Sequence, residues 1–306
     1  MDIFTSLVIP ALVGIGIGIL SGMLGIGGGT VLVPIFRLAF GMSPIMSTAT
    51  SLFTIIPTSV SGAVSHVRHK TCVPSLGLAA GLGGACTSPI GVWLATISPA
   101  WMVMLAAALI IGYSAVNMLR KAWKMKPARS AAPAQAEPAG ETPAEAAVEQ
   151  AGDAAANDDV EPDVPAGSSE IAADTGKSFP KLSRKQLAIG AAIGLGAGLA
   201  SGYVGVGGGF IMVPLMLSLV GISMKQASGT SLIAVTLLAI PGTIEQGLLG
   251  NIDYMAGIAV AVGSIPGAVV GARLVRLVPE RTLRFIFGGF LIVAAVVLVL
   301  NEVGVL

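Results

Sequence analysis

The chain has 306 residues, of which 54% are hydrophobic and only 11% are charged, and its formal net charge is +1. A soluble domain usually has about a quarter charged residues, so this composition excludes an ordinary water-facing surface. The charges are also segregated, because eleven of the sixteen acidic residues lie in 127–180. We therefore expect an all-α integral membrane protein whose basic membrane part is balanced by one acidic segment.

The first uncharged run is Ile3–Phe36. No basic segment precedes it, as it would in a signal peptide, so we expect the run to stay in the mature protein. A helix of about 34 residues would be about 51 Å long, too long for one crossing of a bilayer core of about 30 Å. The triple glycine Gly27–Gly29 tolerates the angles of a chain reversal. We predict a helix, a glycine turn and a half-helix that ends after Pro34.

Three further uncharged runs follow in this half, each near the length of one crossing. They are Ile45–Ser65, Cys72–Ile97 and Trp101–Leu119. The two cysteines, Cys72 and Cys86, match neither a disulfide framework nor a metal spacing. We interpret them as small core residues.

Residues 127–180 are rich in Ala, Pro, Gly and acids and show no hydrophobic period. Such a segment cannot bury enough apolar surface to offset its ordering entropy. We predict a disordered cytoplasmic linker at 127–180 between two membrane domains, 1–126 and 181–306.

The second domain repeats the first. The segment Gly14–Pro34 aligns with Gly194–Pro214 at an offset of 180, and eleven of the 21 positions are identical. The same register continues without a gap as far as Gly91 and Gly271. The second broken run is therefore Leu187–Met224, with its break at Gly207–Gly209, and the predicted spans after it are Gln226–Ile244, Tyr254–Ala272 and Phe285–Asn301.

The basic residues decide how each broken run is placed, because cytoplasmic loops are enriched in Lys and Arg. If each run returns to its starting side, every basic cluster falls on the linker side and only Arg37 lies outside. Each half then crosses an odd number of times, so the two repeats have inverted topology, a recurring plan of secondary transporters. Both termini are predicted to be outside.

The glycine breaks are the first candidate site. A half-helix that begins inside a membrane has unpaired N–H groups and a partial positive charge, which an anion satisfies. A tight turn without a ligand is the alternative. The predicted binding backbone is Gly27, Gly28, Gly29, Thr30, Gly207, Gly208, Gly209 and Phe210.

Small hydroxyl residues recur beside the breaks and in the next span of each half. They either bind anion oxygens or bond to helix carbonyls, and the sequence leaves both open. They are Ser21, Ser201, Thr50, Ser51, Thr230 and Ser231. Glycines spaced by four residues before each break, in contrast, indicate close helix packing; these are Gly14, Gly18, Gly22, Gly194, Gly198 and Gly202.

Ionisable groups are rare in the predicted spans. We place Glu245 near a span end, Asp253 in a short loop, and His66 and His69 as solvated histidines of a cytoplasmic turn. No carboxylate chain for proton transfer, no nucleophile triad and no metal-ligand cluster is present in the pattern. We expect no enzyme, cofactor, metal site or nucleic-acid partner.

At these motifs the chain resembles the TauE/SafE family of sulfite exporters. The resemblance rests on Ser21–Pro34 and Ser201–Pro214, and on the strings Ala49-Thr-Ser51 and Gly229-Thr-Ser231. It covers both membrane domains, while the long acidic linker departs from the compact family pattern. The resemblance implies a permease of the cytoplasmic membrane for sulfite, organosulfonates or related small organic anions.

Three functions follow as hypotheses. The first is an alternating-access anion transporter with its site between the two breaks. The second is a passive anion channel, and the third is a membrane scaffold whose linker recruits a soluble partner. The sequence leaves a homo-oligomer open.

Overall fold

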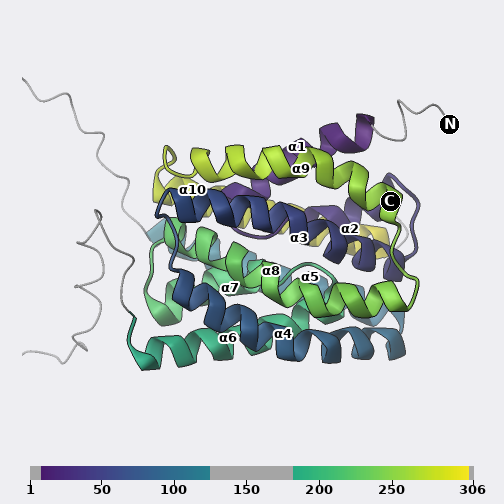
Figure 1. Cartoon of the computed structure of the whole chain (residues 1–306), viewed down its shortest axis with the longest axis horizontal. Coiled ribbons are helices and arrows are strands. Elements are labelled where there is room, and N and C mark those ends of the chain that lie inside the picture. The colour runs from purple at the N-terminus through teal and green to yellow at the C-terminus, as the bar shows by residue number, and fades with distance from the viewer. Residues whose placement is uncertain (1–7, 125–181, 303–306) are drawn as a thin grey trace, which may run out of the picture.

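The computed structural model describes residues 8–124 and 182–302, and every element in these ranges is helical (Figure 1). This confirms the expected all-α class. The predicted linker, 127–180, lies outside the described residues. Five helices are long and apolar enough to cross a membrane by length and composition: Pro74–Ile97, Trp101–Arg120, Arg184–Val204, Met224–Leu248 and Tyr254–Leu274.

Each half contains a broken helix followed by three long helices. The N-terminal half contains α1 (Ile9–Leu24), α2 (Gly29–Leu38), α3 (Pro44–Arg68), α4 (Pro74–Ile97) and α5 (Ala100–Lys124). The C-terminal half contains α6 (Arg184–Val204), α7 (Gly209–Leu215) with the π-helical turn η2 (Met216–Val220), α8 (Met224–Leu248), α9 (Tyr254–Leu274) and α10 (Glu280–Glu302). The predicted break in each opening run is confirmed.

Local sequence explains where these helices begin and end. Ser43, Ser183 and Ser223 are N-caps whose hydroxyls each accept an N–H from the first turn of α3, α6 and α8. This contact satisfies one of the amides that a helix start leaves unpaired. Gly25 and Gly205 end α1 and α6 in the left-handed conformation, a common glycine C-cap.

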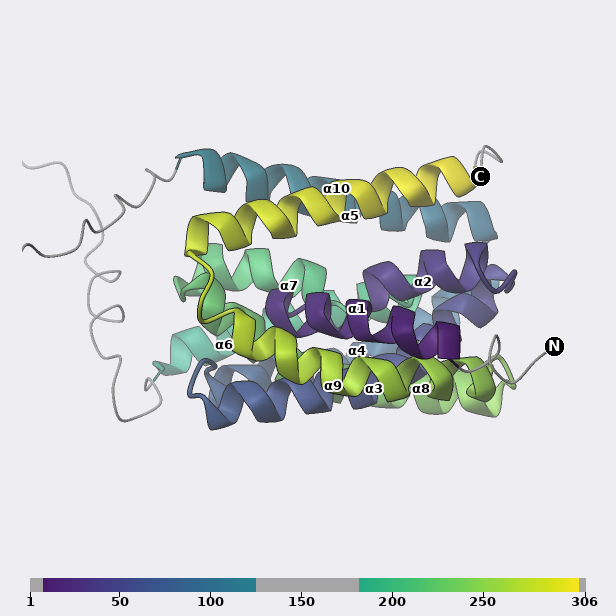
Figure 2. The ribbon, with the colours of Figure 1, turned by 90° about the horizontal axis from the view of Figure 1, so that it is seen from above.

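The two halves run in opposite directions. In Figure 2, α1 and α6 begin at opposite ends of the molecule and both stop near its middle, and α2 and α7 return toward the ends from which those helices came. We call the end where α1 begins the Ile9 end, and the end where α5 ends and α6 begins the Arg184 end. Helix α10 ends at the Ile9 end. Each half therefore traverses the long axis an odd number of times.

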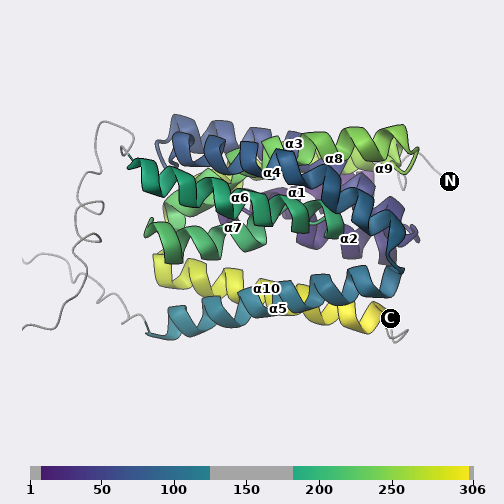
Figure 3. The same ribbon diagram turned by 90° about the horizontal axis from the view of Figure 1, so that it is seen from below.

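Helices are exchanged between the halves. Helix α1 packs on α9 of the other half, and α6 packs on α4. The central helices α3 and α8 contact each other; α3 also contacts α9, and α8 also contacts α4. Helices α5 and α10 form an antiparallel pair along one side (Figure 3). These main contacts keep their pattern when the two halves are swapped, as is expected of two copies of one unit.

The regularly spaced glycines make these exchanged contacts, as predicted. A Cβ added at Gly14, Gly18 or Gly22 would meet the backbone of α9, and one added at Gly194 or Gly198 would meet the backbone of α4. Gly16 and Gly196, on the other faces of the same helices, have nothing within 4 Å. Close backbone approach through small residues is a general mode of helix association in membranes.

The central helices carry the polar side chains of the interior. Helix α3 buries eight hydroxyl residues completely or almost completely, and α8 buries three. Hydroxyls of these helices bond to carbonyls of their own helix, and some also bond to groups of the other half. This hydroxyl content explains why α3, although 25 residues long, is not among the five apolar candidates.

The basic residues are distributed unequally between the two ends of the molecule. Within the described ranges, every basic residue except Arg37 lies near the Arg184 end, and Arg37 is in the last turn of α2, at the Ile9 end. The two ends differ in basic residues because each broken run returns to its starting end.

Candidate functional site

Each break is built from glycines in left-handed backbone conformations. Gly27 and Gly28 have φ of 73° and 87°, and Gly207 and Gly208 have φ of 86° and 66°. L-residues with a Cβ are strained there, whereas glycine is not. Each break therefore reverses the chain within a few residues and begins the next half-helix in the middle of the fold.

The two breaks contact each other. A Cβ added at Gly29 would meet the carbonyl oxygen of Val206, and one added at Gly209 would lie 2.8 Å from the Cα of Ile26. Ile26 and Val206, the residues between the glycines, are completely buried. The structure thus brings the predicted backbone groups of both halves together at one central point.

Several amides at this point have no acceptor. Among the described residues, the N–H groups of Gly27, Gly28, Gly207 and Gly208 donate no hydrogen bond. Neither Gly28 nor Gly208 provides a side-chain cap for the half-helix that it starts. Buried N–H groups without a partner are rare and costly.

Unpartnered hydroxyls occur among the predicted site residues of both halves. The hydroxyls of Ser21, Thr30, Ser51 and Ser201, all predicted site residues, are completely buried and make no hydrogen bond within the described residues. Ser21 lies beside Gly28, since a Cβ there would be 3.7 Å from the Cβ of Ser21. A buried hydroxyl normally has a partner, so this group of orphans is consistent with a polar solute.

Ser59 was missed by the sequence reasoning. Its buried hydroxyl also has no partner, and its Oγ lies 3.2 Å from the position of a Cβ on Gly27. The aligned residue of the other half is Ala239. No repetition could therefore mark Ser59, and only the packing of α3 against the break reveals it.

Three predicted hydroxyls make structural bonds instead. Thr50 Oγ1 accepts the N–H of Asp253 at 3.0 Å, and Thr230 Oγ1 accepts the N–H of Val73 at 2.9 Å. Both bonds fix the start of a helix that belongs to the other half. Ser231 donates to the carbonyl oxygen of Gly25 at 2.7 Å and so ties α8 to the first break.

The last predicted residue, Phe210, contributes bulk rather than polarity. Its side chain is completely buried at the position that Thr30 occupies in the other half. Thr30 instead lines an open apolar groove of about 240 Å³ between α2 and α10. The two breaks therefore share a backbone but differ in the side chain that follows it.

A second cavity, of about 50 Å³, opens at the Ile9 end beside the second break. That volume holds a few water molecules. It is bounded by the starts of α3 and α5 and the ends of α4, α6 and α8; its lining residues are Pro44, Ile45, Thr48, Ala95, Thr96, Ser98, Val103, Tyr203 and Gln246. Thr48 also borders Gly205 of the break, so the cavity reaches toward the central site.

The expectation of a solvated His66 is wrong. Its ring is completely buried, with Nε2 2.9 Å from the carbonyl oxygen of Gly22 and Nδ1 2.7 Å from Thr71 Oγ1. The carbonyl only accepts, so Nε2 carries a proton. The helix α3 continues one turn past the predicted span, and the close approach of α1 covers the ring.

Both cysteines are free thiols. Cys72 is buried, as expected, but the expectation that Cys86 is a core residue is wrong, because it is exposed on the outer face of α4. Cys72 lies in the connection between α3 and α4, and burial raises its pKa to about 11. Within the described residues no cluster of His, Cys, Asp or Glu could hold a metal ion.

Comparison with known proteins gives a consistent family. Residues 10–298 match the model of the family described as sulfite exporter TauE/SafE. The chain is 27% identical to the probable membrane transporter YdhB of Bacillus subtilis over 88% of this chain and 90% of that protein. It is 25% identical to the probable membrane transporter YunE of the same organism over 91% and 92% of the two chains.

A more distant relative carries the family name itself. Sulfite exporter TauE/SafE family protein 3 of Arabidopsis thaliana is 29% identical over 44% of this chain and 30% of its own length. No solved structure matches the chain.

Proposed function

We propose that this chain, which belongs to the TauE/SafE sulfite exporter family, is a secondary transporter of small anions in the cytoplasmic membrane. Membership makes it a multi-pass membrane transporter and not an enzyme. The proposed substrates are sulfite, organosulfonates or related sulfur-containing or organic anions. The proposed mechanism is alternating access between two repeats that cross the membrane in opposite directions.

One observation carries the proposal: the two breaks, whose amides have no acceptor, contact each other, and the orphan hydroxyls of Ser21 and Ser59 lie beside the first of them. Oxyanions have several strong acceptors and suit such a donor set. The site contains no formal charge, so the anion is bound by backbone dipoles and hydroxyls and can be released readily. Because the breaks touch in this conformation, an anion reaches all of these donors only when the halves move apart.

The distribution of charge supports a proposed orientation of the chain. With the Arg184 end in the cytoplasm, all the described basic residues except Arg37 lie on the cytoplasmic side, in agreement with the positive-inside rule. Reporter fusions after Gly250 and at the C-terminus should then report the external side.

The test is counterflow of labelled sulfite in proteoliposomes. Gly28→Ala and Gly208→Ala should each abolish exchange, because the new Cβ occupies the approach to the amides and lies 3.1 Å from Ile17 and 3.0 Å from Ala197, respectively. Gly41→Ala is the matched control, since Gly41 has φ of 64° with nothing within 4 Å. All three variants bear the same backbone strain of about 1–2 kcal/mol, so undiminished exchange in the first two would refute the site.

The same vesicles separate the alternatives. A passive channel would give flux that does not saturate and no counterflow against a gradient. A scaffold would move no anion at all, and deletion of 130–176 would abolish its function. We expect that deletion to leave transport intact.

A further inference from the structure

The two ends of the transport path differ although the halves are copies. At the Ile9 end, the starts of α3 and α5 and the end of α4 surround the open cavity. The residues at the offset of 180 should form the same cavity at the Arg184 end. Six of the nine equivalents are buried side chains, namely Met224, Ser228, Val275, Leu283, Met23 and His66, whereas Lys225, Arg276 and Val278 are partly or fully exposed.

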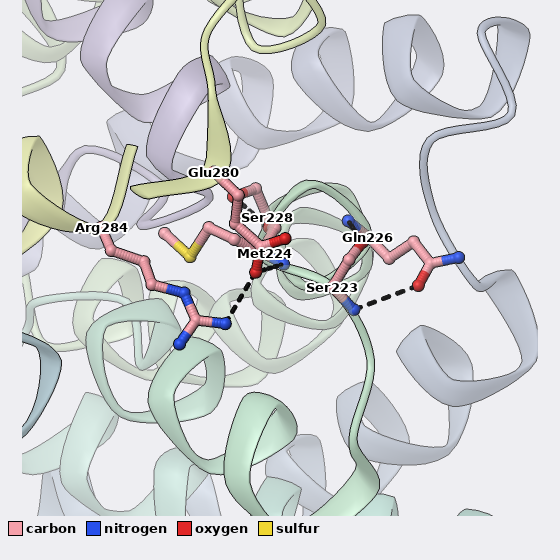
Figure 4. Close-up of polar contacts among 6 residues, drawn as sticks. All are labelled: Ser223, Met224, Gln226, Ser228, Glu280 and Arg284. Carbon is pink, nitrogen blue, oxygen red and sulfur yellow. Dashed lines mark hydrogen bonds and ion pairs between the residues drawn. The ribbon is translucent and has the colours of Figure 1, made fainter. Parts of the chain in front are cut away.

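Polar bonds connect the helices at the Arg184 end. The Glu280 carboxylate accepts the N–H of Met224 at 3.2 Å and pairs with Arg284 at 2.6 Å (Figure 4). Met224 is the first residue of α8. The carboxylate, which belongs to α10, therefore caps the N-terminus of α8. At a helix N-terminus, backbone donors and the helix dipole both favour negative charge.

Two neighbouring bonds bridge the same elements. Lys225 Nζ donates to the carbonyl oxygen of Arg276 at 3.0 Å, which ties the start of α8 to the corner between α9 and α10. Arg276 in turn donates to His69 at 3.2 Å. The start of α8, the end of α3 and the α9–α10 corner are thus connected at one place.

The other half cannot form this connection. The counterpart of Met224 is Pro44, which has no N–H to donate, and the counterparts of Glu280 and Arg284 are Ala100 and Met104. Helix α8 contacts α10, whereas α3 and α5 make no comparable contact among the described residues. The difference in side chains therefore coincides with a difference between the ends, since a cavity lies at the Ile9 end and most of its equivalents at the Arg184 end are buried.

We propose that Glu280, held by Arg284, is the latch of a gate at the Arg184 end of the transport path. While it caps α8, this end is shut and the cavity at the Ile9 end is open to solutes. When the bond breaks, α8 separates from the α9–α10 corner, as α3 is already separated from the α4–α5 corner. This proposal rests on the proposed alternating-access function. It assigns control of the change between the two states to the Arg184 end.

The test measures access rather than flux. Single cysteines are placed at Thr48 and Ser228, equivalent positions of the two ends, after Cys72→Ala and Cys86→Ala. A small charged thiol reagent should modify Thr48→Cys faster than Ser228→Cys. Adding Glu280→Gln or Glu280→Ala should speed modification at 228 by about tenfold or more, the effect of losing one charge-assisted hydrogen bond.

Three comparisons make the outcome specific. Modification at 48 should slow in the same variant by the fraction of the population that moves to the second state, because a gate shifts one population between two states; a merely loosened fold would speed modification at both positions. Glu280→Gln keeps an oxygen for Met224 and should have the smaller effect. Arg281→Ala removes a neighbouring cation that stacks on Phe285 and should change neither rate.

Unchanged modification at 228 in Glu280→Ala, or faster modification at both positions, would overturn the latch. Sulfite counterflow is measured on the same preparations. If the rates shift reciprocally but no sulfite is exchanged, the gate stands and the proposed substrate fails. If sulfite is exchanged and the rates do not respond, the substrate stands and the latch fails.

Discussion

The exchanged packing of α1 on α9 can be tested with two glycines of one helix. Gly18 faces α9, where a new Cβ would lie 2.8 Å from both the nitrogen of Ala268 and the Cα of Ser264. Ordinary contact begins near 3.4 Å, and backbone cannot rotate away as a side chain can. Gly16 is two residues earlier in the same helix and has nothing within 4 Å.

The magnitudes follow from two opposing terms. Alanine favours a helix over glycine by about 1 kcal/mol at either position. Overpacking at Gly18 costs about 1–3 kcal/mol and can cost more. The cost extends to neighbouring contacts of α1, because the two helices must move apart along the whole interface. A change of 1 kcal/mol shifts the melting temperature of a protein of this size by about 2–4 °C. We expect Gly16→Ala to melt about 2–4 °C higher and Gly18→Ala several degrees lower than the parent.

Thermal unfolding of the purified protein in one detergent, at one scan rate, provides the measurement. The equivalent pair in α6, Gly196→Ala and Gly198→Ala, is an internal replicate, because Gly198 faces the backbone of Gly84 and Gly196 faces open space. If both members of either pair shift in the same direction by similar amounts, the glycines do not set the helix contact, and Gly18 and Gly198 are not packed against the backbone of another helix.

Three further outcomes follow from single side chains. Ser21→Ala and Ser59→Ala remove hydroxyls that have no partner, so they should leave the melting temperature unchanged or higher while raising the KM for sulfite by about tenfold; an unchanged KM would remove these two residues from the site. Thr50→Val and Thr230→Val leave a buried N–H without its acceptor and should each cost about 1–3 kcal/mol of stability, so melting at the parent temperature would contradict the helix-fixing role. Cys72, whose pKa is raised to about 11, is protonated at pH 8 and should resist alkylation of the folded protein there; rapid alkylation would show that its surroundings are open.

The parts of the fold that the sequence predicted are those with a local cause. The triple glycines mark both breaks because the backbone angles at Gly28 and Gly208 need glycine. Small residues every four positions mark the faces of α1 and α6 that lie against another helix. Uncharged runs mark the long helices within a few residues of their observed ends. Each of these sequence patterns lies within one segment, so it can be recognised without knowing which other segment packs against it.

The parts that could not be predicted depend on contacts between distant segments. The register of the repeat does not indicate that α1 packs on α9 rather than on a helix of its own half. His66 looked solvated because its neighbours in sequence are charged, yet the carbonyl that covers it belongs to Gly22. The orphan hydroxyl of Ser59 likewise becomes visible only once the first break is placed against α3.

Duplication and asymmetry have different consequences in this fold. Two identical halves would give two equivalent states, each with one end open, and neither would be favoured. Any difference in side chains at the ends therefore acts directly on the equilibrium between the states, and about 1.4 kcal/mol is a factor of ten. Glu280 has no counterpart in the other half, and Pro44 denies that half the N–H that Glu280 uses. The shared glycine breaks can then supply the binding groups, while the unshared residues at the Arg184 end set which side the resting transporter faces.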